Sequence, residues 1–106
     1  MGIKTAPDAN PYTLTKSDHI YIARSGQTLN LPDPTNIIGQ VYYIKLGEPH
    51  AANVTIQCVH GLDTFNIDGA ASDNITKDYG VIGVVAGVNA SGNPQWFLLQ
   101  HIDRNI

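Results

Sequence analysis

The sequence predicts an all-β fold: an antiparallel, jelly-roll-like β-sandwich of about eight short strands in a single domain. Runs rich in Val, Ile, Thr and Tyr recur along the 106 residues. Turn signals made of Gly, Pro, Asn and Asp separate these runs at intervals of about 8 to 12 residues, which is typical of sandwiches and barrels. No segment predicts a helix, because Gly, Pro and Asn interrupt every candidate.

The N-terminal third contains three short predicted strands. They are YTLT (12–15), HIYIA (19–23) and GQTLNLP (26–32). Residues 1–11, which include Pro7 and Pro11, predict a flexible lead-in, so the sandwich is expected to span residues 12–106. The following PDPTNIIG predicts a connection, because two prolines cannot sit in a central strand.

The middle strands alternate and predict which side chains form the core. In GQVYYIKL (39–46), one face carries Tyr42, Ile44 and Leu46. In NVTIQCV (53–59), the inward residues are Val54, Ile56 and Cys58. TFNID (64–68) and a short segment around residues 74–76 predict two further strands before the last two.

The last two strands, VIGVVAGV (81–88) and QWFLLQHI (95–102), are apolar on both faces. Trp96 and Leu98 are expected on the core side, with Phe97 and Leu99 on the other. Burial of such a side chain is worth about 1.5–3 kcal/mol, and monomers avoid large exposed apolar patches. A chain of this length has no second layer to cover them. The sequence therefore predicts that another copy of the chain covers this side, with Val85, Phe97 and Leu99 in the interface, where Gly83 and Gly87 admit a neighbouring backbone.

The charge distribution excludes several partners. Charged residues are 14% of the chain, against about 25% in ordinary domains. The net charge is −3 and the six Lys and Arg are scattered, so no basic stripe predicts nucleic-acid binding. No apolar run approaches the ~18 residues of a membrane helix, and membrane insertion is not expected.

The reactive side chains predict neither an enzyme nor a cofactor or metal site. Cys58 is the single cysteine, which excludes an internal disulfide and a thiolate zinc site, and it is expected to be a buried small hydrophobe. The four histidines lack metal-binding spacing. The Asp residues lack the spacing of a calcium loop, and no G-x-S-x-G motif is present.

The motifs taken in order resemble a family. They run TLNLP, GQVYYIKL, NVTIQC, DTFNIDG, GVIGVV and GNPQWFLL, from about residue 12 to residue 100. This order is similar to that of a small β domain of phage tail fibres, tail spikes and other viral attachment appendages. The resemblance implies a trimeric, all-β module at the virion surface, assembled in the host cytoplasm beside other virion proteins. The longer GEPHAANV turn and the HIDRNI tail depart from the family pattern.

The predicted function is structural trimerisation and attachment to a host-cell glycan or protein receptor through surface loops. Weak contacts would gain through avidity when three copies engage together. The loops 47–52, 69–80 and 89–94 supply the candidate ligand-binding residues His50, Asp73, Asn74, Tyr79 and Asn93. Three alternatives stay open: a carbohydrate-binding module or lectin acting as a monomeric accessory domain, a connector without a ligand, and, least favoured because no convergent acidic pair is present, a polysaccharide depolymerase.

Overall fold

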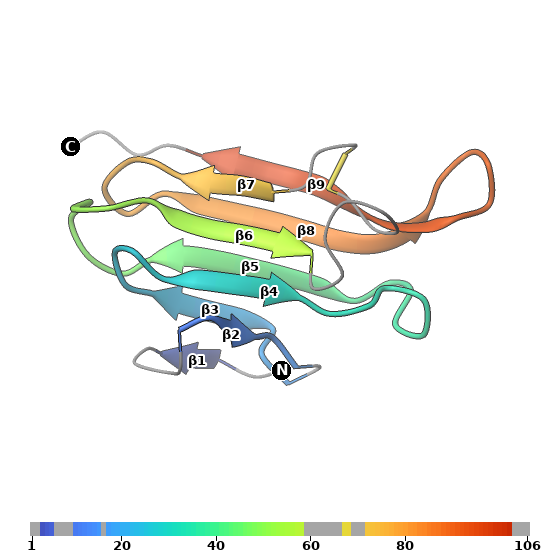
Figure 1. Cartoon of the computed structure of the whole chain (residues 1–106), viewed down its shortest axis with the longest axis horizontal. Helices are drawn as coiled ribbons and strands as arrows, with labels where there is room; N and C mark the ends of the chain where they lie inside the picture. The colour runs from blue at the N-terminus through green and yellow to red at the C-terminus, as the bar shows by residue number, and fades with distance from the viewer. Residues whose placement is uncertain (1–2, 6–9, 16, 59–66, 69–71, 103–106) are drawn as a thin grey trace.

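The computed structural model describes residues 3–5, 10–15, 17–58, 67–68 and 72–102. These residues form nine strands in two sheets and no helix, so the prediction of an all-β, sandwich-like fold is confirmed (Figure 1). In spatial order, the five-stranded sheet contains β1 (Ile3–Thr5), β3 (Ile20–Ala23), β5 (Val41–Leu46), β8 (Val81–Val88) and β9 (Pro94–Ile102). The four-stranded sheet contains β2 (Tyr12–Thr13), β4 (Thr28–Leu31), β6 (Val54–Cys58) and β7 (Ser72–Ile75). None of the described segments is a helix long and apolar enough to span a membrane.

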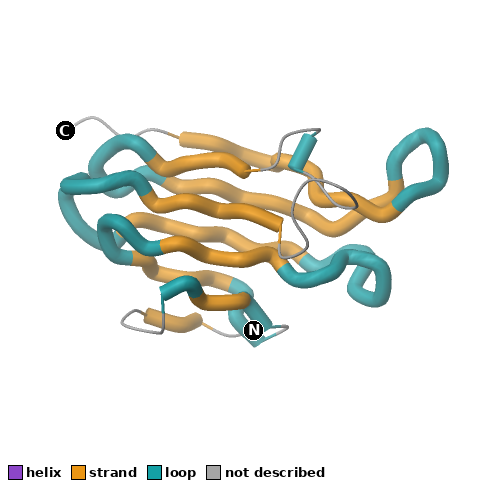
Figure 2. The backbone as a smooth tube through the Cα atoms, in the orientation of Figure 1, coloured by secondary structure: helices purple, strands orange, loops and turns teal. Residues whose placement is uncertain are grey.

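From β1 to β6 the chain changes sheet at every strand (Figure 2). Neighbours within a sheet are therefore separated by one strand of the other sheet, and they run parallel: β1 with β3, β3 with β5, β2 with β4 and β4 with β6. The antiparallel pairs are β5–β8, β6–β7 and β8–β9.

The prediction of a wholly antiparallel, jelly-roll-like sandwich is wrong for these parallel pairs. A jelly roll joins antiparallel strands in Greek keys, whereas here a strand in the opposite sheet provides each crossover between parallel neighbours. Gly, Pro and Asn support both a hairpin and an arch from one sheet to the other. The turn composition therefore does not specify strand direction.

The N-terminal boundary also differs from the expectation. Residues 3–5, assigned above to a lead-in, form β1 and pair in parallel with residues 20–22 of β3. Three residues flanked by Gly2 and Pro7 are too few to show a strand period, and the pairing uses backbone groups that any residue carries.

The core lies between the two sheets. Every second side chain of β3, β4, β5 and β6 is buried, and the inward residues predicted for β5 and β6 are confirmed. Trp96 is fully buried, and its Nε1–H donates to the Pro32 carbonyl oxygen at 3.0 Å. Its ring packs against that of Tyr42, with 5.5 Å between centroids. Trp96 therefore joins β9 to the connection after β4.

A β-bulge interrupts the pairing of β8 with β9. Gly83 lies opposite Gln100 while the next residue, Val84, lies opposite Leu98, which leaves Leu99 as the extra residue. The simple alternation expected for β9 therefore ends at Leu98. Phe97 is partly buried, whereas Leu99 is 52% exposed.

Candidate functional site: an apolar outer sheet face

The outer face of the five-stranded sheet is apolar. Its side chains alternate with the buried core residues, and the strand register places them in rows across the sheet. One row contains Val41, Val85 and Phe97. We call the following set the apolar face: Ile20, Ile22, Val41, Tyr43, Lys45, Val81, Val85, Phe97 and Ile102.

Two glycines make this face flat. A Cβ at Gly83 would lie 2.6 Å from Cε1 of Tyr43, and one at Gly87 would lie 2.9 Å from Cε2 of Phe97. The rings of Tyr43 and Phe97 therefore each cover a glycine of β8. The expectation that Gly83 and Gly87 admit a neighbouring backbone is corrected here, because the rings of Tyr43 and Phe97 occupy that space.

Lys45 is the one charged residue of the apolar face. Its Nζ donates to the Tyr79 carbonyl oxygen at 2.9 Å and lies 5.9 Å from the centroid of the Tyr79 ring. These contacts hold the ammonium group at the end of β5, toward the β7–β8 turn. The centre of the face keeps only apolar and aromatic side chains.

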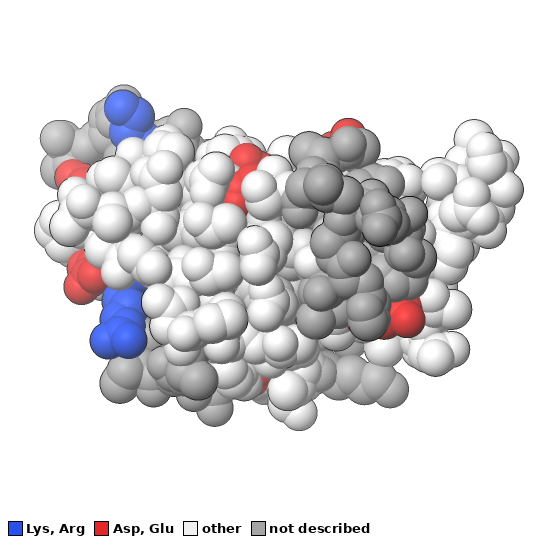
Figure 3. All heavy atoms as spheres, in the orientation of Figure 1, with Lys and Arg blue, Asp and Glu red and all other residues white. Residues whose placement is uncertain are grey.

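The outer face of the four-stranded sheet has the opposite character. It carries Thr28, Asn30, Thr55, Gln57 and Asn74. Side chains bond across the strands: Thr55 Oγ1 donates to Asn74 Oδ1, and Gln57 Nε2 donates to Asn30 Oδ1, both at 2.9 Å. The view in Figure 3 shows few charges on this side of the molecule. One outer face is thus polar and hydrogen-bonded, and the other is apolar.

The structure gives the three interface candidates different positions. Val85 and Phe97 lie side by side on the apolar face and are partly buried by their own neighbours. Leu99 lies at the bulge and is half exposed. None of the three is fully buried within its own chain.

Two of the loop candidates, His50 and Tyr79, come together at one end of the sandwich. The His50 backbone N–H donates to Asp78 Oδ1 at 2.6 Å, next to Tyr79, and His50 Nε2 lies 2.8 Å from Asn53 Oδ1. The β3–β4 turn joins the same cluster, because the Ser25 N–H donates to Glu48 Oε2 at 2.7 Å. Three loops are therefore tied together at this end.

Tyr79 has a left-handed backbone, with φ of 54°. This conformation is uncommon for a bulky residue and costs of order 1 kcal/mol or more. The turn retains it through two contacts: the Tyr79 carbonyl accepts from Lys45, and the Gly80 carbonyl accepts from the Leu46 N–H at 2.9 Å.

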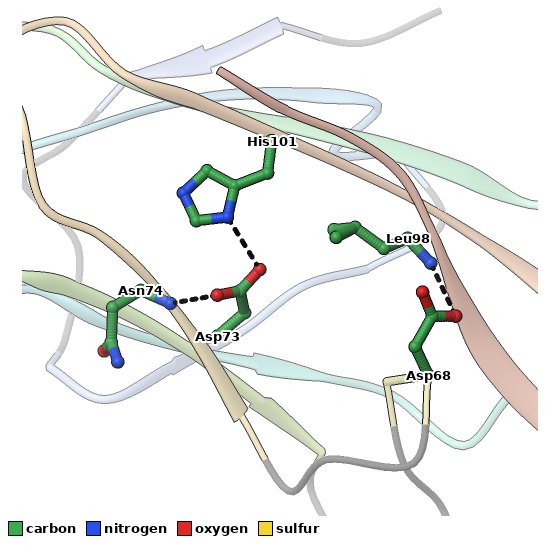
Figure 4. Close-up of polar contacts among 5 residues, drawn as sticks. All are labelled: Asp68, Asp73, Asn74, Leu98 and His101. Carbon is green, nitrogen blue, oxygen red and sulfur yellow. Dashed lines mark hydrogen bonds and ion pairs between the residues drawn. The ribbon is translucent and has the colours of Figure 1, made fainter. Parts of the chain in front are cut away.

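Asp73 and Asn74 lie instead on the edge strand β7 (Figure 4). Asp73 Oδ2 is 3.1 Å from His101 Nδ1 on β9, so the pair links the edges of the two sheets. Both side chains are more than a quarter exposed, and such a pair contributes at most about 1 kcal/mol. Nearby, the Leu98 N–H donates to Asp68 Oδ1 at 3.1 Å.

Asn93 lies apart from the other candidates. It belongs to the β8–β9 hairpin loop, which Figure 1 shows at the opposite end of the sandwich from the β7–β8 turn. Its backbone is held to Asn89 by hydrogen bonds in both directions. The five loop candidates therefore do not form one site.

Sequence reasoning missed a hollow of about 380 Å³ beside the start of β5, lined by residues 36–41 and His19. Ile38 on its wall is 50% exposed. In the sequence, only the pair of isoleucines in the otherwise polar TNIIGQ marks this place: Ile37 packs against the core, whereas Ile38 stays exposed.

Two buried groups have raised pKa values. Burial, and secondarily the charge of Asp18, raises the pKa of Tyr42 to about 12. Its hydroxyl donates to the Thr15 carbonyl oxygen at 3.0 Å. Burial alone raises the pKa of Cys58 to about 11, so this thiol stays protonated at neutral pH and is a poor nucleophile.

Comparison with protein-family models finds no match for this chain, and comparison with curated proteins finds none either. Within the described residues, no group of three or more His, Cys, Asp or Glu side chains is placed to hold a metal ion. Any assignment of function therefore depends on the two outer faces, the loops and the hollow.

Proposed function

We propose that this chain is a self-associating β module of an exterior viral appendage, in which three copies pack through the apolar face and display their loops to a host receptor. The role is structural and adhesive rather than catalytic. The observation that carries the proposal is the contrast between the two outer faces. One face is apolar and flat, and the other is polar, with side-chain hydrogen bonds between neighbouring strands.

The apolar character supports association because a solvent-facing sheet normally alternates apolar and polar residues. On β5, β8 and β9, the outward positions Val41, Val85 and Phe97 break this alternation in one continuous row. A copy packed on this row would remove those side chains from water. The motif order described above supports the viral setting and the threefold symmetry.

The loops support the adhesive part of the proposal. Hydrogen bonds among the β3–β4 turn, the β5–β6 loop and the β7–β8 turn hold one end of the sandwich in a defined shape. Preorganised loops bind with a smaller entropy cost. Three copies side by side would present this end three times to the host.

Charge placed on the apolar face tests the association. Ile102→Asp changes a side chain that is 47% exposed, and Val85→Asp changes the row that Val85 shares with Val41 and Phe97. We expect both variants to sediment as folded monomers, because an interface that buries an unpaired carboxylate loses its stability. Thr28→Asp, on the polar face, is the matched control and should keep the wild-type mass. Equal masses for all four proteins would refute the proposal.

A monomeric carbohydrate-binding module is the second candidate. It is favoured by the partly exposed rings of Tyr43 and Phe97 lying flat over Gly83 and Gly87, because such rings on a sheet can stack against sugar rings. The two candidates differ in one result. If the wild type is a monomer, and Tyr43→Ala abolishes its binding to an insoluble polysaccharide, the second candidate replaces the first.

A further inference from the structure

We propose that Asp68 and Asp73 cap the sheet edges along one side of the sandwich and so prevent a second copy of the chain from adding to them as a strand. The inference concerns a surface that the proposed function does not use, and it holds for a monomer as well as for a trimer. It depends on where two carboxylates lie relative to the outward-facing backbone N–H groups of β9 and β7.

The strands β9 and β7 are the last strands of their sheets and lie on the same side of the sandwich (Figure 1). Among the described residues, β9 is the longest strand, and its sequence PQWFLLQHI is mostly apolar. An edge strand presents backbone N–H and carbonyl groups that another chain can use for strand pairing. The identical edge of a second copy is always available as such a partner.

The backbone groups of Trp96 and Leu98 face away from β8. Both backbone groups of Ala86 bond toward β5, to residues 39 and 40. Ala86 and Trp96 therefore form the non-hydrogen-bonded kind of antiparallel pair, in which the groups of Trp96 point outward. The N–H of Leu98 also points outward, because it bonds to Asp68 on the side opposite β8.

Asp68 occupies the position that an added strand would take. Its N–H donates to the Trp96 carbonyl oxygen at 3.1 Å, and its Oδ1 accepts the Leu98 N–H at 3.1 Å (Figure 4). In a continued parallel ladder a backbone carbonyl would accept that N–H. Asp68 has φ of 49°, and its carboxylate accepts the N–H in place of a backbone carbonyl. The preceding residue, Ile67, bridges to Trp96 and is buried, so it anchors the cap in the core.

Asp73 caps the neighbouring edge in a similar way. The Thr55 N–H donates to the Gln27 carbonyl oxygen beside β4, so Thr55 and its partner Asn74 also form a non-hydrogen-bonded pair. The Asn74 N–H therefore faces outward from β7, and Asp73 Oδ1 accepts it at 2.9 Å. Carboxylates of the chain itself thus occupy the outward N–H groups of both Leu98 and Asn74.

The bulge at Leu99 provides a second contact for Asp73. Without the extra residue, Gln100 rather than His101 would occupy the next inward position of β9. With it, His101 lies opposite the buried Ile82, and its Nδ1 lies 3.1 Å from Asp73 Oδ2. Both oxygens of the Asp73 carboxylate are therefore held, one by β7 and the other by β9.

The two caps restrict how copies of the chain can associate. An incoming strand would have to displace the carboxylates and leave them beside its own carbonyl oxygens, which are also hydrogen-bond acceptors. Pairing of β9 with β9 of a second copy would also join closed oligomers into open chains, if the copies already packed through the apolar face. The caps leave a face, rather than an edge, as the surface for association.

Removal of the two acceptors tests the inference. Asp68→Gly introduces a residue that adopts positive φ without strain, and Asp73→Ala leaves residues 67–68 unchanged, so it remains a test even if the first variant fails to fold. We expect each folded variant to form a species of about twice the wild-type mass or more at high loading concentration. Light scattering coupled to size-exclusion chromatography measures this mass.

Two control variants separate the edge from the charge. Asp33→Ala removes the same charge and an acceptor of a backbone N–H, that of Thr35 at 2.8 Å, but in a loop rather than at a strand edge. Asp68→Asn retains an acceptor, and Asn tolerates the left-handed backbone. Both controls should keep the wild-type mass.

Amide hydrogen exchange locates the new contact. In dilute solution the Leu98 amide of Asp68→Gly and the Asn74 amide of Asp73→Ala should exchange faster than in the wild type, because each has lost its acceptor. At the concentration where the mass rises, the same amides should regain protection, because a strand of the second copy then accepts them.

A folded edge variant of unchanged mass would overturn the inference. So would association that Asp33→Ala shows equally, or association that leaves the Leu98 and Asn74 amides unprotected. The wild-type mass separates this result from the proposed function. A wild-type monomer whose edge variants associate contradicts the trimer alone. A trimer whose edge variants stay trimers contradicts the caps alone.

Discussion

At the scale of single residues, Trp96 is the largest fully buried side chain among the described residues. Its indole is fully buried and donates to the Pro32 carbonyl oxygen. Trp96→Phe removes that bond and leaves a cavity, so we expect the free energy of unfolding to fall by about 2 kcal/mol or more. Chemical denaturation measures the change. Asn93→Ala is the control and should lie within about 0.5 kcal/mol of the wild type.

Two other buried residues make stability depend on alkaline pH. In the folded chain the pKa of Cys58 rises from 9.0 to about 11 and that of Tyr42 from 10.0 to about 12. The native state therefore keeps protons that the unfolded chain releases. The stabilisation is complete below pH 9 and is lost as the pH rises from 9 toward 12.

Single substitutions separate the two contributions. Tyr42→Phe should lower stability at neutral pH by about 1 kcal/mol, because the bond to the Thr15 carbonyl is lost, and should flatten the decline between pH 10 and 12. Cys58→Ala should flatten the decline between pH 9 and 11. Denaturation curves across this range measure both effects. A decline of unchanged slope in either variant would show that the group titrates normally in the folded chain.

At the scale of strands, the pairing of glycine with an aromatic ring sets the shape of the apolar face. Gly83→Ala would press its new methyl group into the Tyr43 ring and lift the ring from the sheet. We expect a loss of about 1 kcal/mol of monomer stability and weaker self-association. In a Tyr43→Ala background the same substitution should cost almost nothing, since the ring is gone. A double-mutant cycle measures this coupling, and an additive result would mean that the ring and the glycine do not interact.

The strands themselves were largely predictable from the sequence, whereas their connections were not. The inward residues of β5 and β6 follow from alternation, because burial selects apolar side chains at every second position. The parallel direction of β4 beside β6 does not follow from alternation. It depends on whether the connection after β4 returns to the same sheet or crosses to the other one. The β-bulge at Leu99 was not predictable from the sequence either, because the extra residue is apolar like its neighbours.

The candidate site was predictable to a lesser degree. The sequence predicted an apolar outer side for β9 from Phe97. The rest of the apolar face consists of residues from strands that are not adjacent in sequence, so no local pattern predicts it. His50 and Tyr79 were recognised as loop residues, yet their meeting through Asp78 depends on the tertiary arrangement. The hollow combines His19 with residues 36–41, and no linear pattern connects them.

At the scale of the whole molecule, the sandwich has one polar and one apolar outer face, a tied loop end and an opposite end that contains the β8–β9 hairpin. This asymmetry suits a homo-oligomer, because one surface can be buried between copies while the other surfaces stay accessible to solvent. Association through the apolar face would leave the polar face, with Thr55 and Gln57, in contact with water.

The mass of the wild-type chain in solution tests the self-association claim most directly. Light scattering coupled to size-exclusion chromatography, over a range of loading concentrations, gives this mass without assuming a shape. The account predicts a trimer, three times the 11.4 kDa of one chain. A single species of 11.4 kDa at every concentration would contradict it, because the apolar face would then be stable in water on its own.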